Sequence, residues 1–302
     1  MKLAILLLCH KNAEQINLFL QTMKHPDIDF YIHVDKKSHI TNQIAKRPDI
    51  HILSDSLRVD VQWGGISMIQ ATLNMLQEAY CSKKFDYYWL CSGQDFPLKS
   101  PKEIVLYFQN YWDKNFVSLI SSANYLDHKK NSYDKRNDLF FPRFLMRRNA
   151  KARLLKRIFI EVSGGWNHTF PIFERRGRFA QTDFYYGPQW WAITNAFAGW
   201  LLKYLKDNPW YMKGYCNSLT PDESFFQTLL MMSPYKDTQH EYLHYIDWSE
   251  RPGKPRNSPN TLTMADYDKM KASGYLMARK FDIDVDKDII YKLMKDNWQT
   301  IS

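Results

Sequence analysis

Apolar runs and helical periodicities alternate along the first 120 residues of the chain. Continuous apolar runs predict buried strands over Leu3–Cys9, Phe30–Val34, His51–Leu53, Tyr87–Cys91 and Phe116–Ile120. Between them, apolar residues recur at helical steps over Ala13–Met23, Ile66–Tyr80 and Pro101–Tyr111, and Ser100 stands where a helix N-cap is expected. This alternation is typical of an α/β domain with a mostly parallel central sheet flanked by helices.

The second half of the chain carries the same signals less regularly. Strands are predicted over Gln189–Thr194 and Tyr242–Trp248. Helices are predicted over Asn149–Val162, Asn195–Leu205, Asp266–Ser273 and Asp286–Asn297. We find no internal repeat, and we interpret residues 1–302 as a single domain.

Polar residues follow three of the predicted strands. His10 comes after the first strand, Asp35 after the second, and Asp95 shortly after Tyr87–Cys91. Ligands of open α/β sheets bind at the carboxyl ends of the strands, so these residues are candidates for a ligand site at one sheet edge. The alternative for each residue is local, because a strand-end Asp often only caps the next turn and a lone His can be structural.

The net charge of +9 is concentrated in one segment of the chain. Between Arg143 and Arg178, ten basic residues stand against only Glu161 and Glu174, so this stretch carries +8 of the charge. Such a distribution disfavours a uniformly basic nucleic-acid-binding surface. Within the segment, Asn149–Val162 is predicted to form a basic amphipathic helix, which is either solvated surface or a contact for an anionic acceptor or a membrane.

Cysteine usage and hydropathy bear on the cellular compartment. The cysteines form no C-x-x-C pair and lie in or beside apolar runs, which predicts buried free thiols in a reducing environment; they are Cys9, Cys81, Cys91 and Cys216. The first apolar run is too short for a signal peptide, and no run reaches the roughly 18 apolar residues of a membrane helix. We therefore expect a cytoplasmic protein, with peripheral contact to the inner face of the membrane as an open alternative.

Several catalytic fingerprints are missing from the sequence. It contains no Walker P-loop, no G-x-G-x-x-G, no G-x-S-x-G and no H-E-x-x-H. Its D-x-D strings do not end a strong buried strand, where a metal–diphosphate site would lie. The sequence therefore predicts no metal site and no cofactor.

Without a metal ion, Arg and Lys side chains would have to stabilise the charge that develops on a diphosphate leaving group. The candidates are Arg279 and Lys280, which are adjacent, and the group Arg251, Lys254 and Arg256.

Transfer of a sugar to a hydroxyl also needs a base and a surface that binds sugars. Glu223 stands in a T-x-x-E pattern with Thr220, so it either closes a helix capping box or serves as a general base. Trp63, Trp190 and Trp191 could stack on sugar rings, or they could belong to the core.

Six segments, in order along nearly the whole chain, resemble the Core-2/I-branching β-1,6-N-acetylglucosaminyltransferases and the related peptide O-xylosyltransferases. They are His33-Val-Asp-Lys-Lys37, Trp63-Gly-Gly65, Ser92-Gly-Gln-Asp-Phe-Pro-Leu-Lys99, Gly187-Pro-Gln-Trp-Trp191, Pro221-Asp-Glu-Ser-Phe-Phe226 and Ala278-Arg-Lys-Phe-Asp282. Each segment alone is weak, whereas six in order are specific, and the last four resemble the xylosyltransferase and bacterial branch more closely. The resemblance implies a GT-A-like fold, a nucleotide-sugar donor, inversion at the anomeric carbon and no required metal.

The resemblance also implies roles for single residues. Glu223 matches the general base. The positions that match the donor side are Leu8, His10 and Asp35 for uracil and ribose, Trp63 for the active-site wall, and Arg279 and Lys280 for the diphosphate, with Arg251 as a further candidate. The positions expected on the acceptor side are Asp95, Gln189, Trp190 and Trp191. Xylosyltransferases can carry an acidic residue at the position of Gln189, so that acidic helper is missing here.

From these features we expect an inverting, metal-independent glycosyltransferase. The donor is expected to be UDP-GlcNAc, with UDP-xylose as the alternative, and the acceptor a glycan or lipid-linked glycan of bacterial polysaccharide assembly. We expect residues 1–120 to form a nucleotide-binding half and 121–302 an acceptor and catalytic half, with the basic insert at about 125–178. The rival hypotheses are a non-catalytic glycan-binding relative and, through the basic segment, a nucleic-acid binder.

Overall fold

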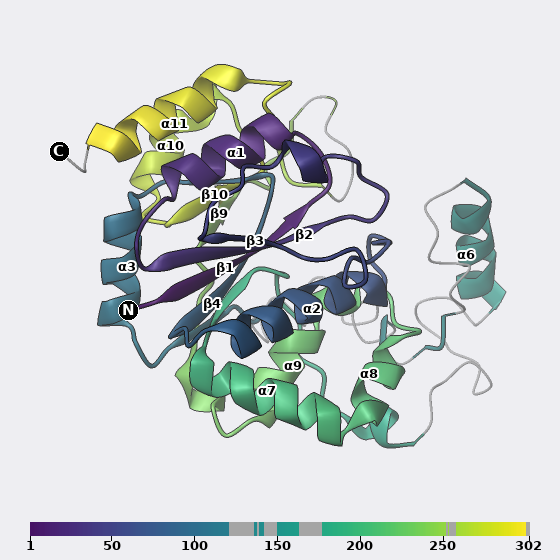
Figure 1. Ribbon diagram of the computed structural model, residues 1–302. Coiled ribbons are helices and arrows are strands. Elements are labelled where there is room, and N and C mark those ends of the chain that lie inside the picture. The colour runs from purple at the N-terminus through teal and green to yellow at the C-terminus, as the bar shows by residue number, and fades with distance from the viewer. Residues whose placement is uncertain are drawn as a thin grey trace.

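A large mixed sheet lies at the centre of the computed structural model, which describes residues 1–120, 136–137, 139–141, 150–162, 177–251, 253 and 258–299 (Figure 1). The order of its strands is β3-β2-β1-β4-β7-β6-β8. Their bounds are β1 Leu3–Cys9, β2 Ile28–Val34, β3 Ile50–Ile52, β4 Tyr87–Ser92, β6 Asn115–Val117, β7 Trp191–Thr194 and β8 Gln239–His240. Strands β3, β2, β1 and β4 are mutually parallel, and β7 runs antiparallel to both of its neighbours. This confirms the predicted α/β class with a mostly parallel sheet.

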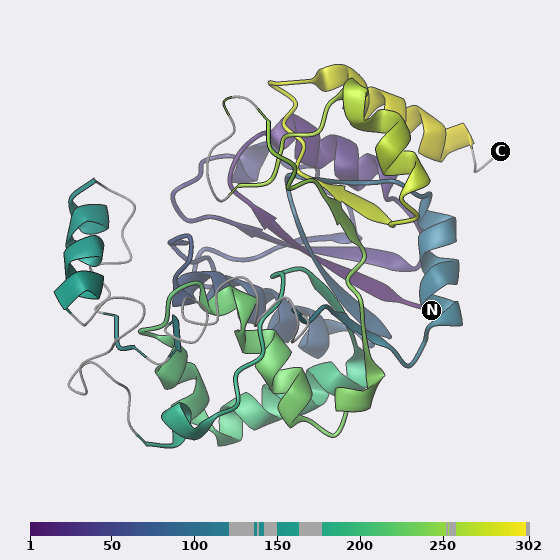
Figure 2. The ribbon, with the colours of Figure 1, turned by 180° about the vertical axis from the view of Figure 1, so that it is seen from behind.

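Helices cover both faces of this sheet (Figures 1 and 2). Their bounds are α1 Ala13–Thr22, α2 Ile66–Ser82, α3 Pro101–Asn110, α6 Ala150–Val162, α7 Asn195–Asp207, α8 Pro209–Tyr215, α9 Phe225–Met232, α10 Tyr267–Ala272 and α11 Lys287–Gln299. Because side chains alternate along a strand, Ile5 of β1 enters the core under α1 and α11, whereas Leu6 enters the core under α2, α7 and α9. Burial on both faces explains why this strand reads as one continuous apolar run.

A second, smaller sheet joins three segments that are distant in the sequence. Strand β10 (Met277–Arg279) lies between β5 (Asp95–Pro97), which is antiparallel to it, and β9 (His244–Ile246), which is parallel. Its register pairs Arg279 with Asp95 and with Ile246. This sheet therefore brings the predicted cation Arg279 beside Asp95.

N-terminal helix caps were predicted at two residues, Ser100 and Thr220. The N-cap predicted at Ser100 is confirmed, because its side chain accepts from the Glu103 N–H; the Glu103 side chain in turn accepts from the Ser100 N–H, which completes a capping box. The capping box predicted at Thr220 is wrong. Thr220 has a positive φ of 43° and makes no side-chain cap bond, residues Pro221–Glu223 form a short 3-10 turn, and α9 begins only at Phe225.

Other predicted features differ from the structure in detail. The strand predicted over Gln189–Thr194 begins at Trp191, and Pro209 opens a further helix, α8, that the sequence did not predict. All four cysteines are free, but Cys81 is exposed and Cys216 only half-buried, so burial is confirmed only for Cys9 and Cys91. Among the described helices, none combines the length and apolarity needed to cross a bilayer.

Candidate active site

The carboxyl ends of β1 and β2 form the edge at which donor residues were predicted. Leu8 is half-buried near the end of β1, His10 follows that strand and is exposed, and Asp35 follows β2. The Asp35 N–H donates to the Cys9 carbonyl at 2.8 Å, and the Asp35 carboxylate accepts from the Lys37 N–H at 2.9 Å. The three predicted residues therefore lie at one sheet edge.

A polar bridge connects this edge to the loop after β10. Lys11 Nζ lies 2.5 Å from Asp282 Oδ2, and the Asn12 amide donates to Asp282 Oδ1 at 2.8 Å. Partial desolvation and the adjacent Lys11 lower the pKa of His10, so its imidazole is neutral near pH 7 and can both donate and accept. The bridge places Lys280, two residues before Asp282, on the same side of the fold as His10.

His33, in the segment that precedes Asp35, is buried under the loop that leads to Trp63. Its Nε2 accepts from the Val59 N–H at 2.8 Å, and burial lowers the pKa of His33 to about 4. A neutral ring is therefore required to hold this loop in place.

This buried histidine predicts acid destabilisation. The folded-state pKa lies below the unfolded value of 6.5, so the unfolded chain binds the extra proton as the pH falls from 6.5 towards 4. The free energy of unfolding should fall by about 3 kcal/mol from this group across that window. In urea titrations at several pH values, His33→Gln, whose amide oxygen can accept the same bond, should show a shallower slope than wild type. An unchanged slope would contradict the assignment.

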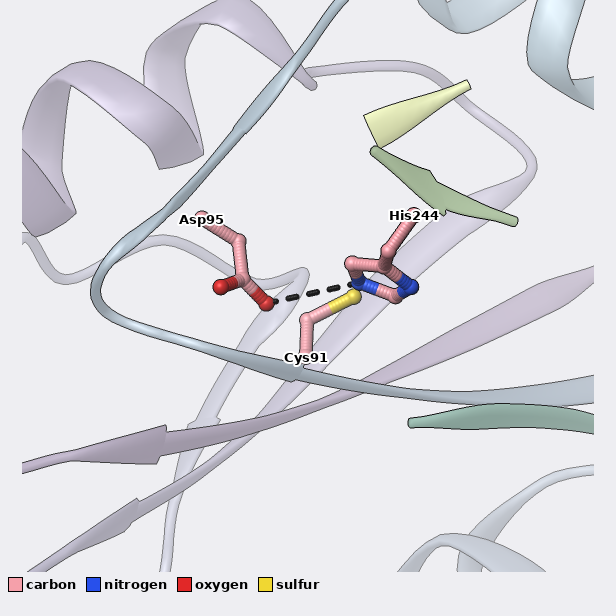
Figure 3. A group of neighbouring side chains, drawn as sticks. All are labelled: Cys91, Asp95 and His244. Atoms are coloured by element: carbon pink, nitrogen blue, oxygen red, sulfur yellow. Dashed lines mark ion pairs between the residues drawn. The ribbon is translucent and has the colours of Figure 1, made fainter. Parts of the chain in front are cut away.

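Asp95 is fully buried, and its carboxylate contacts four groups from three segments, of which Figure 3 shows His244. Its carboxylate accepts from the Ser92 N–H at 2.7 Å and from the Ser92 hydroxyl at 2.8 Å. Arg279 Nη1 lies 3.3 Å from Oδ1, and His244 Nε2 lies 3.4 Å from Oδ2. Burial alone would raise the pKa of Asp95, but Arg279 and then His244 outweigh it and keep the carboxyl ionised. Asp95 was predicted to bind the acceptor. No part of it is exposed, and its carboxylate contacts Arg279 instead.

Arg279 also stacks on the predicted sugar-binding tryptophan Trp190. Its guanidinium carbon lies 3.6 Å from the centroid of the Trp190 ring, and the His244 ring packs between Trp190 and Trp89 with centroids 5.7 Å from each. Trp190 is buried by these contacts. Trp191 is also buried and packs on Phe226 at 4.9 Å, so the core alternative is the correct one for Trp191.

Cys91, Asp95 and His244 form a buried group of the kind that can hold a metal ion, with ligand atoms within 4.8 Å of one another (Figure 3). Burial raises the pKa of the Cys91 thiol well above its usual value, so a thiolate ligand would be costly. The Arg279 guanidinium already compensates the charge of Asp95. The group therefore fits a neutral thiol and an Asp–Arg ion pair better than an added cation.

Glu223 lies in the short turn before α9 with a half-exposed carboxylate. Arg136 Nη1 donates to its Oε2 at 2.5 Å, and its backbone carbonyl accepts from the Gly187 N–H at 2.8 Å. The Thr220 N–H donates to the Gly64 carbonyl at 3.0 Å, which sets the exposed Trp63 and its glycines against the same turn. Glu223 is therefore an accessible carboxylate that is paired with a guanidinium.

The segment from Gly187 to Trp190 connects this turn to Arg279. Gly187 must be glycine, because a Cβ there would meet the Ser118 carbonyl oxygen at 2.0 Å. The Gln227 amide donates to the Pro188 carbonyl at 2.7 Å, and Trp190 then underlies Arg279. One short segment thus touches both the predicted base and the predicted diphosphate cation.

Buried polar atoms without a hydrogen-bond partner in the described chain surround this segment. They are Thr220 Oγ1, Asp222 Oδ1, Gln189 Nε2 and Gln227 Oε1. Burial, and then the neighbouring Glu223, raise the pKa of Asp222 to about 7. Orphaned buried groups commonly bind water or a ligand, so the predicted acceptor residue Gln189 stands at a place where a ligand could satisfy them.

The other cations predicted to contact the diphosphate differ in their surroundings. Arg251 is engaged by Asp247 and by Asp266, at 2.5 Å each, so its charge is compensated within the fold, which argues against the predicted diphosphate contact. Lys254 and Arg256 lie outside the described residues. Lys280 Nζ donates to Ser258 Oγ at 2.8 Å, and its pKa is lowered by burial and then by Arg279 and Lys11.

Sequence reasoning missed three residues of this region. Arg136 and Asp222 contact or adjoin Glu223, and His244 contacts Asp95. Asp222 could have been noticed as a second carboxylate beside Glu223. Arg136 and His244 carry no local signal, because their partners are distant in the sequence.

Comparisons with known proteins agree with these motifs. A family model, Core-2/I-Branching enzyme, matches residues 3–271 of the chain. Xylosyltransferase 1 of Rattus norvegicus is 25% identical over 320 residues, which cover 97% of this chain and 35% of that protein. A xylosyltransferase of Ciona intestinalis is 25% identical over 324 residues (97% and 34%), and xylosyltransferase 2 of Bos taurus is 24% identical over 321 (97% and 33%).

The chain spans about a third of the length of the curated relatives it matches. Its α/β architecture, with a mostly parallel central sheet, is GT-A-like and agrees with the family match. Because the family model covers most of the sequence, the chain belongs to the family of Core-2/I-branching enzymes.

Proposed function

We propose that this protein is an inverting glycosyltransferase that moves a sugar from a UDP-sugar to a hydroxyl of a glycan acceptor. The observation that carries the proposal is the short connection between an accessible carboxylate and a cation. Glu223 is held by Arg136 and by Gly187, and the same segment continues to Trp190 beneath Arg279. A base and a group that stabilises a leaving anion are the two parts that such a reaction needs.

The proposed reaction has a single displacement step. Glu223 takes the proton of the acceptor hydroxyl while the oxygen attacks the anomeric carbon and the bond to the diphosphate breaks. The electron pair of that bond leaves with UDP, whose charge Arg279 and Lys280 stabilise. Arg279 Nη1 forms an ion pair with Asp95 at 3.3 Å but makes no hydrogen bond within the described part of the chain, so a diphosphate oxygen could accept from it.

The donor side is proposed at the edge formed by Leu8, His10 and Asp35, with Trp63 on the adjoining loop. Neutral His10 and the carboxylate of Asp35 can hydrogen-bond a base and a ribose hydroxyl. GlcNAc is the proposed donor sugar, and the names of the relatives make xylose the alternative. Metal independence, which the family resemblance suggested, is part of the proposal.

A panel of UDP-sugars tests the proposal. Thermal unfolding should shift upwards with UDP-GlcNAc or UDP-xylose and with UDP, but not with ADP-glucose, because any ligand that binds only the folded state raises Tm. The donor that shifts Tm most should release UDP on incubation with the enzyme, and EDTA should change the rate less than about twofold. A Tm shift with glycans alone, without UDP release, would favour the glycan-binding alternative. Strong inhibition by EDTA would contradict the metal-free reaction.

A further inference from the structure

Helix α6 presents a stripe of apolar side chains to solvent. Leu154, Ile158 and Val162 follow one another at helical steps and are 60%, 48% and 57% exposed, and Leu155 beside them is 45% exposed. Single exposed apolar residues are normal on a protein surface, but here four large ones lie on one face of the same helix. A contiguous apolar patch of this kind marks an interaction site.

The opposite face of α6 is anchored to the body of the protein. Ala152 and Ile160 are buried, and Ile160 belongs to an apolar cluster with Leu139 and Phe141 against which Leu219 packs. The ring of Phe159 lies 5.6 Å from that of Phe141. Figures 1 and 2 show α6 at the edge of the molecule, to the side of α2 and α8. The helix therefore has a fixed inner face and an apolar outer face.

The anchor lies next to the candidate active site. Leu219 directly precedes Thr220, the cap residue of the turn that carries Glu223. Lys156, on the inner side of α6, has a pKa lowered by burial and by Arg136, the residue that binds Glu223. One helix thus touches the surroundings of Glu223 on one side and offers apolar side chains on the other.

The charge of α6 indicates what covers its apolar face. Lys151, Arg153 and Arg157 are exposed, and Glu161 is the only acidic residue of the helix. In the sequence, Arg143, Arg147 and Arg148 come shortly before it. A cationic helix with an exposed apolar stripe is typical of helices that lie in the plane of an anionic bilayer surface. A second copy of the same helix is disfavoured as the occupant, because two such cationic faces would repel each other.

We propose that α6 docks on an anionic lipid bilayer, with Leu154, Leu155, Ile158 and Val162 entering the headgroup region and the adjacent cations contacting lipid phosphates. Docking holds the Glu223 turn close to the membrane surface. If the proposed function is correct, on which this further step rests, the acceptor hydroxyl belongs to a lipid-linked glycan in that membrane.

Vesicle sedimentation of the full chain tests the docking. Wild type should bind vesicles of phosphatidylglycerol and phosphatidylcholine at least about tenfold more tightly than phosphatidylcholine vesicles, and binding should weaken with salt. Leu154→Ser with Ile158→Ser should lose at least about tenfold of this affinity, and so should Arg153→Glu with Arg157→Glu. Trp112→Ser, which removes a 70% exposed apolar side chain elsewhere, is the matched control and should bind like wild type.

Two further measurements separate the possible failures. Circular dichroism should show that each variant unfolds at the wild-type Tm, and UDP release from free UDP-sugar should be unchanged in the α6 variants. Equal binding to neutral and anionic vesicles, or wild-type binding by both double variants, would overturn the docking. A dimer that the apolar variant converts to a monomer would assign the face to a second copy and also overturn it. If wild type releases no UDP, the proposed function is wrong, but the vesicle result still tests the docking.

Discussion

Replacing Glu223 by Gln is expected to lower the turnover number by about 10²- to 10⁴-fold while leaving the affinity for UDP within about twofold of wild type. The amide keeps the size of the side chain and can still accept from Arg136, but it cannot take a proton from the acceptor hydroxyl. Turnover and binding should therefore separate. UDP affinity by calorimetry and UDP release by a coupled assay measure the two quantities.

The control for this substitution is Glu78→Gln, an exposed carboxylate on α2. It removes the same charge outside the candidate site and should leave both quantities unchanged. If Glu223→Gln retains more than about a tenth of wild-type turnover, the general base is another group, and Asp222 becomes the first residue to test.

Replacing Arg279 by Ala is expected to have two effects that a second substitution separates. Loss of the guanidinium leaves the carboxylate of Asp95 buried without its main counter-charge, which should lower the free energy of unfolding by about 3–5 kcal/mol. The same loss removes a charged donor to the diphosphate and should raise the Kd for UDP about 10- to 100-fold.

The double variant Arg279→Ala with Asp95→Asn isolates the binding effect. Neutralising Asp95 should recover part of the stability, because no unpaired charge is then buried, but it should not recover UDP affinity. Urea unfolding and UDP calorimetry on the two variants give the answer. If the double variant binds UDP like wild type, Arg279 only supports the fold, and the cation at the diphosphate must be sought elsewhere.

The central sheet could be predicted because its signals are local. Strand β1 is buried on both faces, so its run from Leu3 to Cys9 is continuous and its bounds were predicted without error. The edge residues His10 and Asp35 followed from the rule that such sheets bind ligands at the carboxyl ends of their strands. These predictions needed only periodicity and chain direction.

The interior of the site could not be predicted, because its contacts are not local. The pairing of β5 with β10 sets Asp95 behind Arg279, and no pattern near either residue indicates it. The T-x-x-E spacing was misleading because Thr220 is held in a left-handed conformation by the bond to Gly64, so Glu223 stands in a turn and not in a helix cap.

The basic segment shows what a charge count can and cannot indicate. Most of the net charge lies between Arg143 and Arg178, but the cations proposed to meet UDP, Arg279 and Lys280, lie outside it. Charge alone suggested either solvated surface or an anionic partner for the helix predicted there. The exposed apolar stripe of α6 beside its arginines is the observation behind our proposal that this partner is a bilayer surface.

The central claim is inverting sugar transfer from a UDP-sugar, and the configuration of the product tests it most directly. The enzyme is incubated with the preferred α-linked UDP-sugar and with methanol as a surrogate for the acceptor hydroxyl, and the methyl glycoside is examined by proton NMR. Unlike a free sugar, this product keeps its anomeric configuration in solution. Attack by an oxygen deprotonated by Glu223 predicts the methyl β-glycoside, formed by wild type and not by Glu223→Gln. A methyl α-glycoside, or equal yields from both proteins, would contradict the account.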